Sequence, residues 1–225
     1  MPWGRSTPRL RKKTLPKETD CYDRNLPPDL SGPVDLGRLR RVLAALPANA
    51  RHGDEPGVQI ENPVEAAVLF PIVLRENGTT VLLTQRTEHL RDHAGQISFP
   101  GGRAETRDLS PTHTALREAE EEIGLSSAHV EVVGTLPEYL TVTGYRITPV
   151  VAFLTPPFSL RPDPSEVAEV FEVPFAFLMN PENHQRRSRE VQGKTRYFFA
   201  MPYGRHFIWG ATAGIIVSLA RALAT

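Results

Sequence analysis

The feature that most constrains this chain is residues 118–122, which read Glu-Ala-Glu-Glu-Glu. On a helix with 3.6 residues per turn, Glu118, Glu121 and Glu122 share one face. Glu120 points away from that face. Like charges at this spacing repel by roughly 0.2–0.5 kcal/mol per pair on an isolated helix. Such a cluster needs a compensating cation, and carboxylate oxygens suit Mg²⁺, Mn²⁺ or Ca²⁺. The sequence therefore suggests a metal site, with a salt-bridged helix end as the plain alternative.

Capping residues and periodic apolar positions predict three helices, over about 36–46, 111–123 and 211–224. The first has Asp35 as N-cap and ends at Pro47, and the second has Ser110 as N-cap and stops at Gly124. Strands are expected at 66–74, 80–86, 130–136, 146–154 and 167–173.

Proline, asparagine and glycine residues predict turns and strand irregularities within a layered α/β domain. Pro71 interrupts the first strand, so we expect an edge or bulged strand there. Asn77-Gly78 is a hairpin turn signal, and a later hairpin lies near Gly193 and Gly204. Residues 87–109 read mostly as loop. Strands interleaved with helices favour a mixed sheet between helical layers.

Composition divides the chain into three segments. Residues 1–33 form a basic, proline-rich tail, residues 34–63 a helix and linker, and residues 64–225 the main domain. The 26 basic and 26 acidic residues argue against a general nucleic-acid binder. The lone Cys21 excludes an internal disulfide framework and a multi-cysteine zinc site. No apolar run is long enough for a membrane span, and a cytoplasmic protein is expected.

Residues 102–125 resemble the Nudix box, a glycine followed by spaced glutamates and an Arg-Glu-x-x-Glu-Glu-x-Gly end. The second half matches closely. The first half departs, because Asp108 replaces a glutamate and eight residues rather than seven separate it from Arg117. An upstream block resembles the coenzyme A diphosphatase branch, which characteristically has this aspartate and longer spacer. That block comprises Leu82-Leu83-Thr84-Gln85-Arg86, Arg91, Gly95 and Phe99-Pro100-Gly101-Gly102.

The resemblance implies roles for individual residues. Glu118 and Glu122 would ligate Mg²⁺ or Mn²⁺, with Glu121 binding a further ion and the Gly101 carbonyl adding a ligand. Arg117 is expected to hold a carboxylate by a bidentate bond rather than to touch substrate.

The general base and the substrate contacts rest on weaker signals. Glu166 is the first candidate for the base and Glu121 its rival, although Glu166, Glu169 and Glu172 also suit a solvated strand edge. Phosphate contacts are expected from two arginines, with polar neighbours nearby. These substrate-binding candidates are Arg86, Arg91, Gln96 and Ser98.

The resemblance implies a Nudix-type α/β/α sandwich and metal-dependent hydrolysis of the diphosphate of coenzyme A or its derivatives. Products would be 3′,5′-ADP and 4′-phosphopantetheine. The alternatives are another nucleoside diphosphate, such as ADP-ribose or a dinucleotide, and a non-catalytic nucleotide sensor. Because sensors usually lose the box acids, the intact Glu118, Glu121 and Glu122 favour the enzyme. A small-molecule substrate is expected, without nucleic-acid or membrane partners, and the resemblance allows a homodimer.

Overall fold

A computed structural model describes residues 34–47, 50–54, 60–90, 93–191 and 193–225. The helices are α1 (Leu36–Ala45), α2 (Pro111–Ile123), α3 (Phe175–Met179) and α4 (Ala211–Ala224), with short 3₁₀ turns at Ser127–His129 and Pro181–Asn183. The strands are β1 (Arg51–Gly53), β2 (Val64–Arg75), β3 (Gly78–Arg86), β4 (Ile97–Ser98), β5 (Gly101–Arg103), β6 (Val130–Thr135), β7 (Glu138–Leu140), β8 (Tyr145–Leu154), β9 (Val167–Pro174), β10 (Gln185–Val191), β11 (Lys194–Tyr203) and β12 (His206–Trp209).

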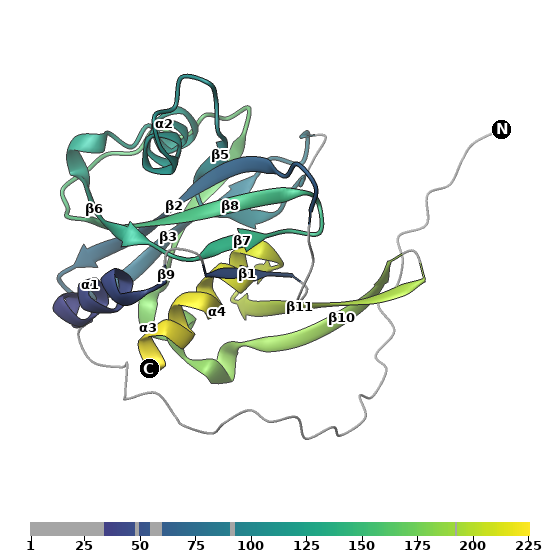
Figure 1. Ribbon diagram of the computed structural model, residues 1–225. Helices are drawn as coiled ribbons and strands as arrows, with labels where there is room; N and C mark the ends of the chain where they lie inside the picture. The colour runs from purple at the N-terminus through teal and green to yellow at the C-terminus, as the bar shows by residue number, and fades with distance from the viewer. Residues whose placement is uncertain (1–33, 48–49, 55–59, 91–92, 192) are drawn as a thin grey trace.

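The described strands form two sheets. The larger has nine strands in the order β1-β7-β8-β2-β3-β4, with β5 paired to β2, β6 to β8 and β9 to β3. Strand β2 runs parallel to β8 and antiparallel to β3 and β5, so the sheet is mixed. The smaller sheet is the antiparallel meander β10-β11-β12, and its β10–β11 hairpin projects to the right of the larger sheet in Figure 1.

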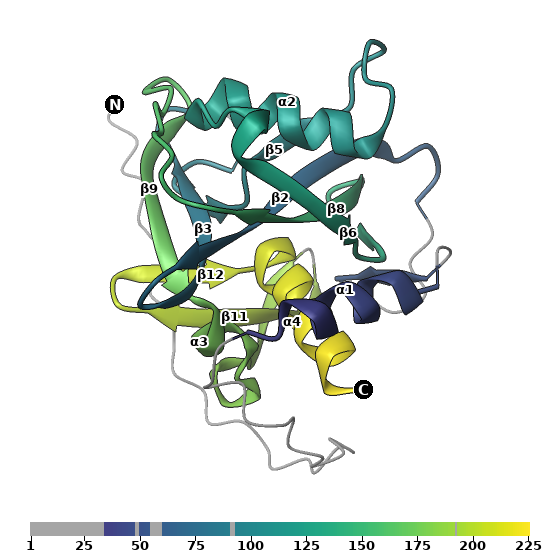
Figure 2. The same ribbon diagram turned by 90° about the vertical axis from the view of Figure 1, so that its left-hand side faces the viewer.

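Helices cover both faces of the larger sheet, as Figure 2 shows: α2 lies on one side and α1, α3 and α4 on the other. Alternation along β2 explains this, because successive side chains point to opposite faces. Ala67 and Leu69 pack with α2, whereas Phe70 and Ile72 pack with α4. The predicted α/β/α arrangement of a mixed sheet between helices is confirmed.

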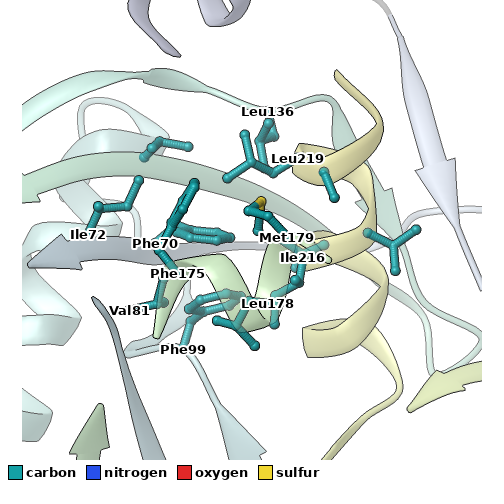
Figure 3. Packing of buried hydrophobic residues seen from close by; sticks show 14 of the residues in the cluster. Phe70, Ile72, Val81, Phe99, Leu136, Phe175, Leu178, Met179, Ile216 and Leu219 are labelled. Carbon is teal, nitrogen blue, oxygen red and sulfur yellow. The ribbon is translucent and has the colours of Figure 1, made fainter. Parts of the chain in front are cut away.

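The core on the α4 side is the larger of two buried clusters (Figure 3). The rings of Phe70 and Phe99 pack in a tilted arrangement with centroids 4.5 Å apart, and Ile216 and Leu219 of α4 pack onto the same cluster. Leu39 of α1 is also fully buried there. This N-terminal helix therefore shares the core of the sheet.

The prediction of an edge or bulged strand at Pro71 is wrong, because β2 lies in the middle of the sheet. Strand β5 pairs with residues 66–68 of β2, and β3 pairs with residues 72–75. Pro71 falls between these two partners, so its missing amide hydrogen removes no bond from either antiparallel ladder. One long strand therefore changes partners at the proline.

The sequence pattern did not predict several short helices and strands. The segment expected to be a linker contains β1, which pairs in parallel with β7 at the sheet edge. The expected loop over 87–109 contains β4 and β5, and neither β7 nor α3 was predicted. Elements of two to five residues carry too few positions for periodicity to show.

The caps predicted for the helices are confirmed. Asp35 accepts a hydrogen bond from the Arg38 amide, and Ser110 accepts one from the His113 amide. Gly124 has the left-handed conformation, with φ of 65°. No helix in the described part of the chain is long and apolar enough to cross a membrane. The predicted basic tail, residues 1–33, lies outside the described residues.

Candidate active site

The end of α2 carries the acidic cluster against the sheet. Ala115, Ala119 and Ile123 are fully or almost fully buried on the inner face of the helix. The two alanines are small enough to let the helix backbone approach the sheet closely. Gly124 then stops the helix, and its amide donates to the carbonyls of Ala119 and Glu120. The last turn is consequently fixed where β5 passes beneath it.

Glu122 is the most deeply buried acid of α2, with 4% of its surface exposed. The Gly101 amide donates to one carboxylate oxygen at 3.1 Å, and Arg86 Nη1 donates to the other at 3.2 Å. Burial raises the pKa of Glu122 to about 7, against the lowering effects of Gly101 and Arg86. The negative charges of Glu118 and Glu166 raise it further. Its ionised form is thus short of compensating positive charge.

Glu118 lies over β5 beside Glu122. Burial is the largest cause of its raised pKa, while Arg117 lowers that pKa and Glu121 and Glu166 raise it. Its carboxylate fills the space that a side chain at Gly102 would occupy, because a Cβ there would come within 2.5 Å of it. Gly101 is equally constrained, since a Cβ would meet the Ala67 carbonyl at 2.4 Å. The paired glycines let the backbone pass directly under the carboxylates.

Arg117 organises the acids around it. Its Nε and Nη2 donate to the two oxygens of Asp108 at 3.0 and 2.9 Å, a bidentate pair. Nη1 reaches Glu121 at 2.7 Å and Glu118 at 3.0 Å. The bidentate pair lowers the pKa of Asp108 and raises that of Arg117. Among the described residues, every partner of the Arg117 guanidinium is a carboxylate or a backbone carbonyl.

The remaining acids fall into different environments. Glu121 is 52% exposed and bonds both Arg117 and Arg107, and Glu120 is exposed on the outer side of the helix. Glu166 lies half-buried in the turn before β9, close enough to Glu118 and Glu122 to raise the pKa of each. Of the five acids named here, Glu166 alone joins the cluster from another element.

The other two acids of the late strand are engaged elsewhere. Glu169 pairs with Arg205 and with His206, and Glu172 pairs with Arg75 and accepts from Thr80. These bonds hold both carboxylates in place on the sheet surface. Glu169 and Glu172 are thus engaged in ion pairs, whereas Glu166 lies close enough to Glu118 and Glu122 to raise the pKa of each.

The charge balance of the cluster suits a cation. Six carboxylates are linked through these interactions to three arginines, which leaves a net charge of −3 within this set: Glu105, Asp108, Glu118, Glu121, Glu122 and Glu166 against Arg86, Arg107 and Arg117. In the described residues, no three His, Cys, Asp or Glu side chains are placed so that together they could hold a metal ion. Arginine donors occupy oxygens of Glu118, Glu121 and Glu122, so an ion bound by these oxygens would have to displace those donors. Hard carboxylate donors and unmet negative charge fit a divalent metal.

A cleft of about 410 Å³ opens beside the buried Glu122. Gly101 and Arg86, the two groups that bond Glu122, both line it. Gln96 and Ser98 line it as well, so three of the predicted substrate contacts meet in one place. Arg91 lies outside the described residues. Arg86 was expected to contact phosphate, but its Nη1 already donates to Glu122. Its buried Nε has no hydrogen-bond partner among the described residues.

Tertiary structure adds residues that sequence reasoning left out. Arg103 and Tyr145 both line the cleft, and Arg103 donates to the Tyr145 hydroxyl at 2.6 and 3.1 Å. Arg189 and Trp209 line the far end. Nothing in the spacing of these residues connects them to the box. The only signal is compositional, arginines and aromatics alternating on the last hairpins.

Comparison with known proteins gives consistent results. The model of the NUDIX domain matches residues 64–192. The "Uncharacterized Nudix hydrolase NudL" of Escherichia coli K12 is 44% identical over 159 residues, which cover 71% of this chain and 82% of that protein.

Solved structures show weaker similarity. A Nudix hydrolase from M. smegmatis, RenU, shares 25% identity with a TM-score of 0.43, covering 55% of this chain and 78% of that one. A MutT/nudix family protein from Enterococcus faecalis shares 17% identity with a TM-score of 0.44, covering 75% and 65% respectively.

Proposed function

This chain belongs to the Nudix hydrolase family, whose members hydrolyse diphosphate bonds of small molecules with divalent metal ions, and from that premise we propose that its substrate is coenzyme A or a coenzyme A derivative. Hydrolysis of that diphosphate releases 3′,5′-ADP and a 4′-phosphopantetheine. The ion is Mg²⁺ or Mn²⁺. The proposed setting is the cytoplasm, and a homodimer is compatible with the proposal.

The observation that carries the substrate assignment is the position of one sequence block. Arg86, Gly101 and Gly102 belong to the block that resembles the coenzyme A diphosphatase branch, and Gln96 and Ser98 lie between its parts. All five line the cleft beside Glu122. Residues from both ends of this block thus line one ligand-sized space next to the acids. This arrangement supports a substrate whose diphosphate lies at Glu122 while the rest occupies the cleft.

The acids of α2 have different proposed roles in metal binding. In the proposal, Glu118 and Glu122 hold the metal, with Glu121 and the Gly101 carbonyl as further ligands. When bound, a divalent ion neutralises diphosphate oxygens and lowers the pKa of a water. The Gly101 amide fixes the Glu122 carboxylate, and Arg117 fixes Glu118 and Glu121. Arg86 is placed to exchange its bond to Glu122 for a substrate phosphate oxygen.

Glu166 is the proposed general base, since it approaches the metal-binding acids from another element. We expect Glu166→Gln to lower kcat about a hundredfold or more, with KM changed by less than about threefold. Glu121→Gln is the comparison. If Glu121→Gln shows the larger loss in kcat at saturating metal, Glu121 is the base and the assignment of Glu166 is wrong.

A substrate panel tests the proposed function. Purified full-length chain is assayed with Mg²⁺ and with Mn²⁺ against coenzyme A, acetyl-coenzyme A, ADP-ribose and a diadenosine polyphosphate, with products separated chromatographically. We expect the highest kcat/KM for coenzyme A or its thioester, with 3′,5′-ADP as a product. Turnover of ADP-ribose at an equal or higher kcat/KM refutes the substrate assignment. Binding of nucleotides without turnover of any substrate supports the sensor alternative.

A further inference from the structure

The meander β10–β12 presents a basic and aromatic face. Strand pairing sets Arg187 opposite Phe198, Arg189 opposite Arg196, and Ala200 opposite Trp209. Alternation then places six large side chains on one face: Arg187, Arg189, Arg196, Phe198, Phe207 and Trp209. The one acid in these strands, Glu190, lies on the other face. Two arginines directly opposite one another repel, so this face gains nothing in stability from their pairing.

One end of this face lies in the cleft. Arg189 and Trp209 line the same 410 Å³ space as Arg86 and Gly101, the two residues that bond Glu122. A single ligand can therefore reach from the acidic cluster to Arg189. Arg187, two residues earlier on the same face, stacks on Phe207 but does not line the cleft.

The arginines of the cleft differ in how their donors are used. Arg86 donates to Glu122 and Arg103 donates to Tyr145. Arg189 has its guanidinium carbon 5.2 Å from the centroid of the Trp209 ring and, among the described residues, has no hydrogen bond and no carboxylate partner. Stacking holds the guanidinium plane and leaves its edge free to form paired hydrogen bonds.

We infer that Arg189, held against Trp209 at the far end of the cleft, binds a phosphate monoester of the substrate, remote from the diphosphate that is hydrolysed. A planar guanidinium matches two phosphate oxygens, and the absence of acids on this face within β10–β12 favours a dianion there. The inference rests on the proposed function, because coenzyme A carries such a group as its 3′-phosphate. Trp209 is a positioning residue that orients the arginine.

The test compares substrates with and without the monoester. In the full-length chain, Arg189→Gln is expected to raise KM for coenzyme A about ten- to a hundredfold, with kcat unchanged. KM for coenzyme A lacking its 3′-phosphate is expected to stay within about twofold. The matched control is Arg186→Gln, on the same strand and stacked on Tyr197 but facing away from the cleft. It should leave both substrates unchanged.

A binding measurement separates this inference from the proposed function. Calorimetric titration of the wild type is expected to give tighter binding of 3′,5′-ADP than of 5′-AMP, and Arg189→Gln should abolish the difference. If coenzyme A is hydrolysed but Arg189→Gln changes both substrates equally, or neither, the inference is wrong and the proposed function stands. If no coenzyme A compound is hydrolysed, the proposed function fails, and the titration still decides the role of Arg189.

Discussion

Replacing Glu122 by glutamine is expected to lower kcat at least about a hundredfold while the protein stays folded. Glu122 is the buried centre of the acidic cluster, and the neutral amide loses the charge that attracts a divalent ion. The amide oxygen still accepts from the Gly101 backbone, so the local backbone keeps its support. Steady-state rates with saturating coenzyme A and Mn²⁺, together with calorimetric titration of Mn²⁺, measure the effect.

The matched control is Glu120→Gln, which removes an equal charge from the exposed side of the same helix. It should retain wild-type turnover. Melting curves in chelator verify folding, and their pH dependence has a definite sign. Because the pKa of Glu122 is raised from 4.5 to about 7, the wild type should lose more stability than Glu122→Gln as pH rises through that range. Near-native turnover in a folded Glu122→Gln protein would contradict the proposed metal-binding role.

The second large effect concerns stability. Arg117→Met should lower the melting temperature by roughly 10 °C, because it leaves buried carboxylates without their cation. The Asp108 side chain is only 2% exposed and receives both arms of the guanidinium. Glu118 and Glu121 lose the same partner, so turnover should fall as well. Thermal melting by circular dichroism and the standard assay report the two losses separately.

A double variant identifies the cause. Adding Asp108→Asn to Arg117→Met should restore most of the lost melting temperature, since the neutral amide keeps an acceptor for Thr114 and the Glu105 amide. Activity should stay low, because Glu118 and Glu121 remain unsupported. Arg41→Met, which breaks only an exposed pair with Asp35 at 3.8 Å, should melt like the wild type. If Arg117→Met melts as Arg41→Met does, the bidentate pair is not a support of the fold.

Local signals predicted the main elements well. The helix over 111–123 and its caps follow from Ser110, Pro111 and Gly124, residues whose preferences act within one or two turns. The family resemblance also predicted that these elements form an α/β/α sandwich. The prediction from Pro71 failed, because the cost of a proline in a strand depends on which neighbouring strand pairs at that residue. Here the partners are β3 and β5, and the sequence around Pro71 does not specify how they pair.

The sequence predicted some features of the site, and only the fold revealed the others. Spacing on one helix brings Glu118, Glu121 and Glu122 together. It does not reveal the partner of Arg117, because that partner is an aspartate in a loop. In the sequence, Asp108 departs from the box pattern, because it stands where that pattern has a glutamate. In the fold it is the bidentate anchor of Arg117.

The sequence by itself determined the helix, its acidic face and the family, because those depend on short-range periodicity and spacing. Only the tertiary structure decided which glutamate is buried, which acid outside the helix faces the cluster, and which arginines share the cleft. Burial and through-space charge depend on what packs against each side chain. Thus Glu122 lies under Arg86 and Gly101, Glu166 arrives from the turn before β9, and Arg189 reaches the cleft from a separate sheet.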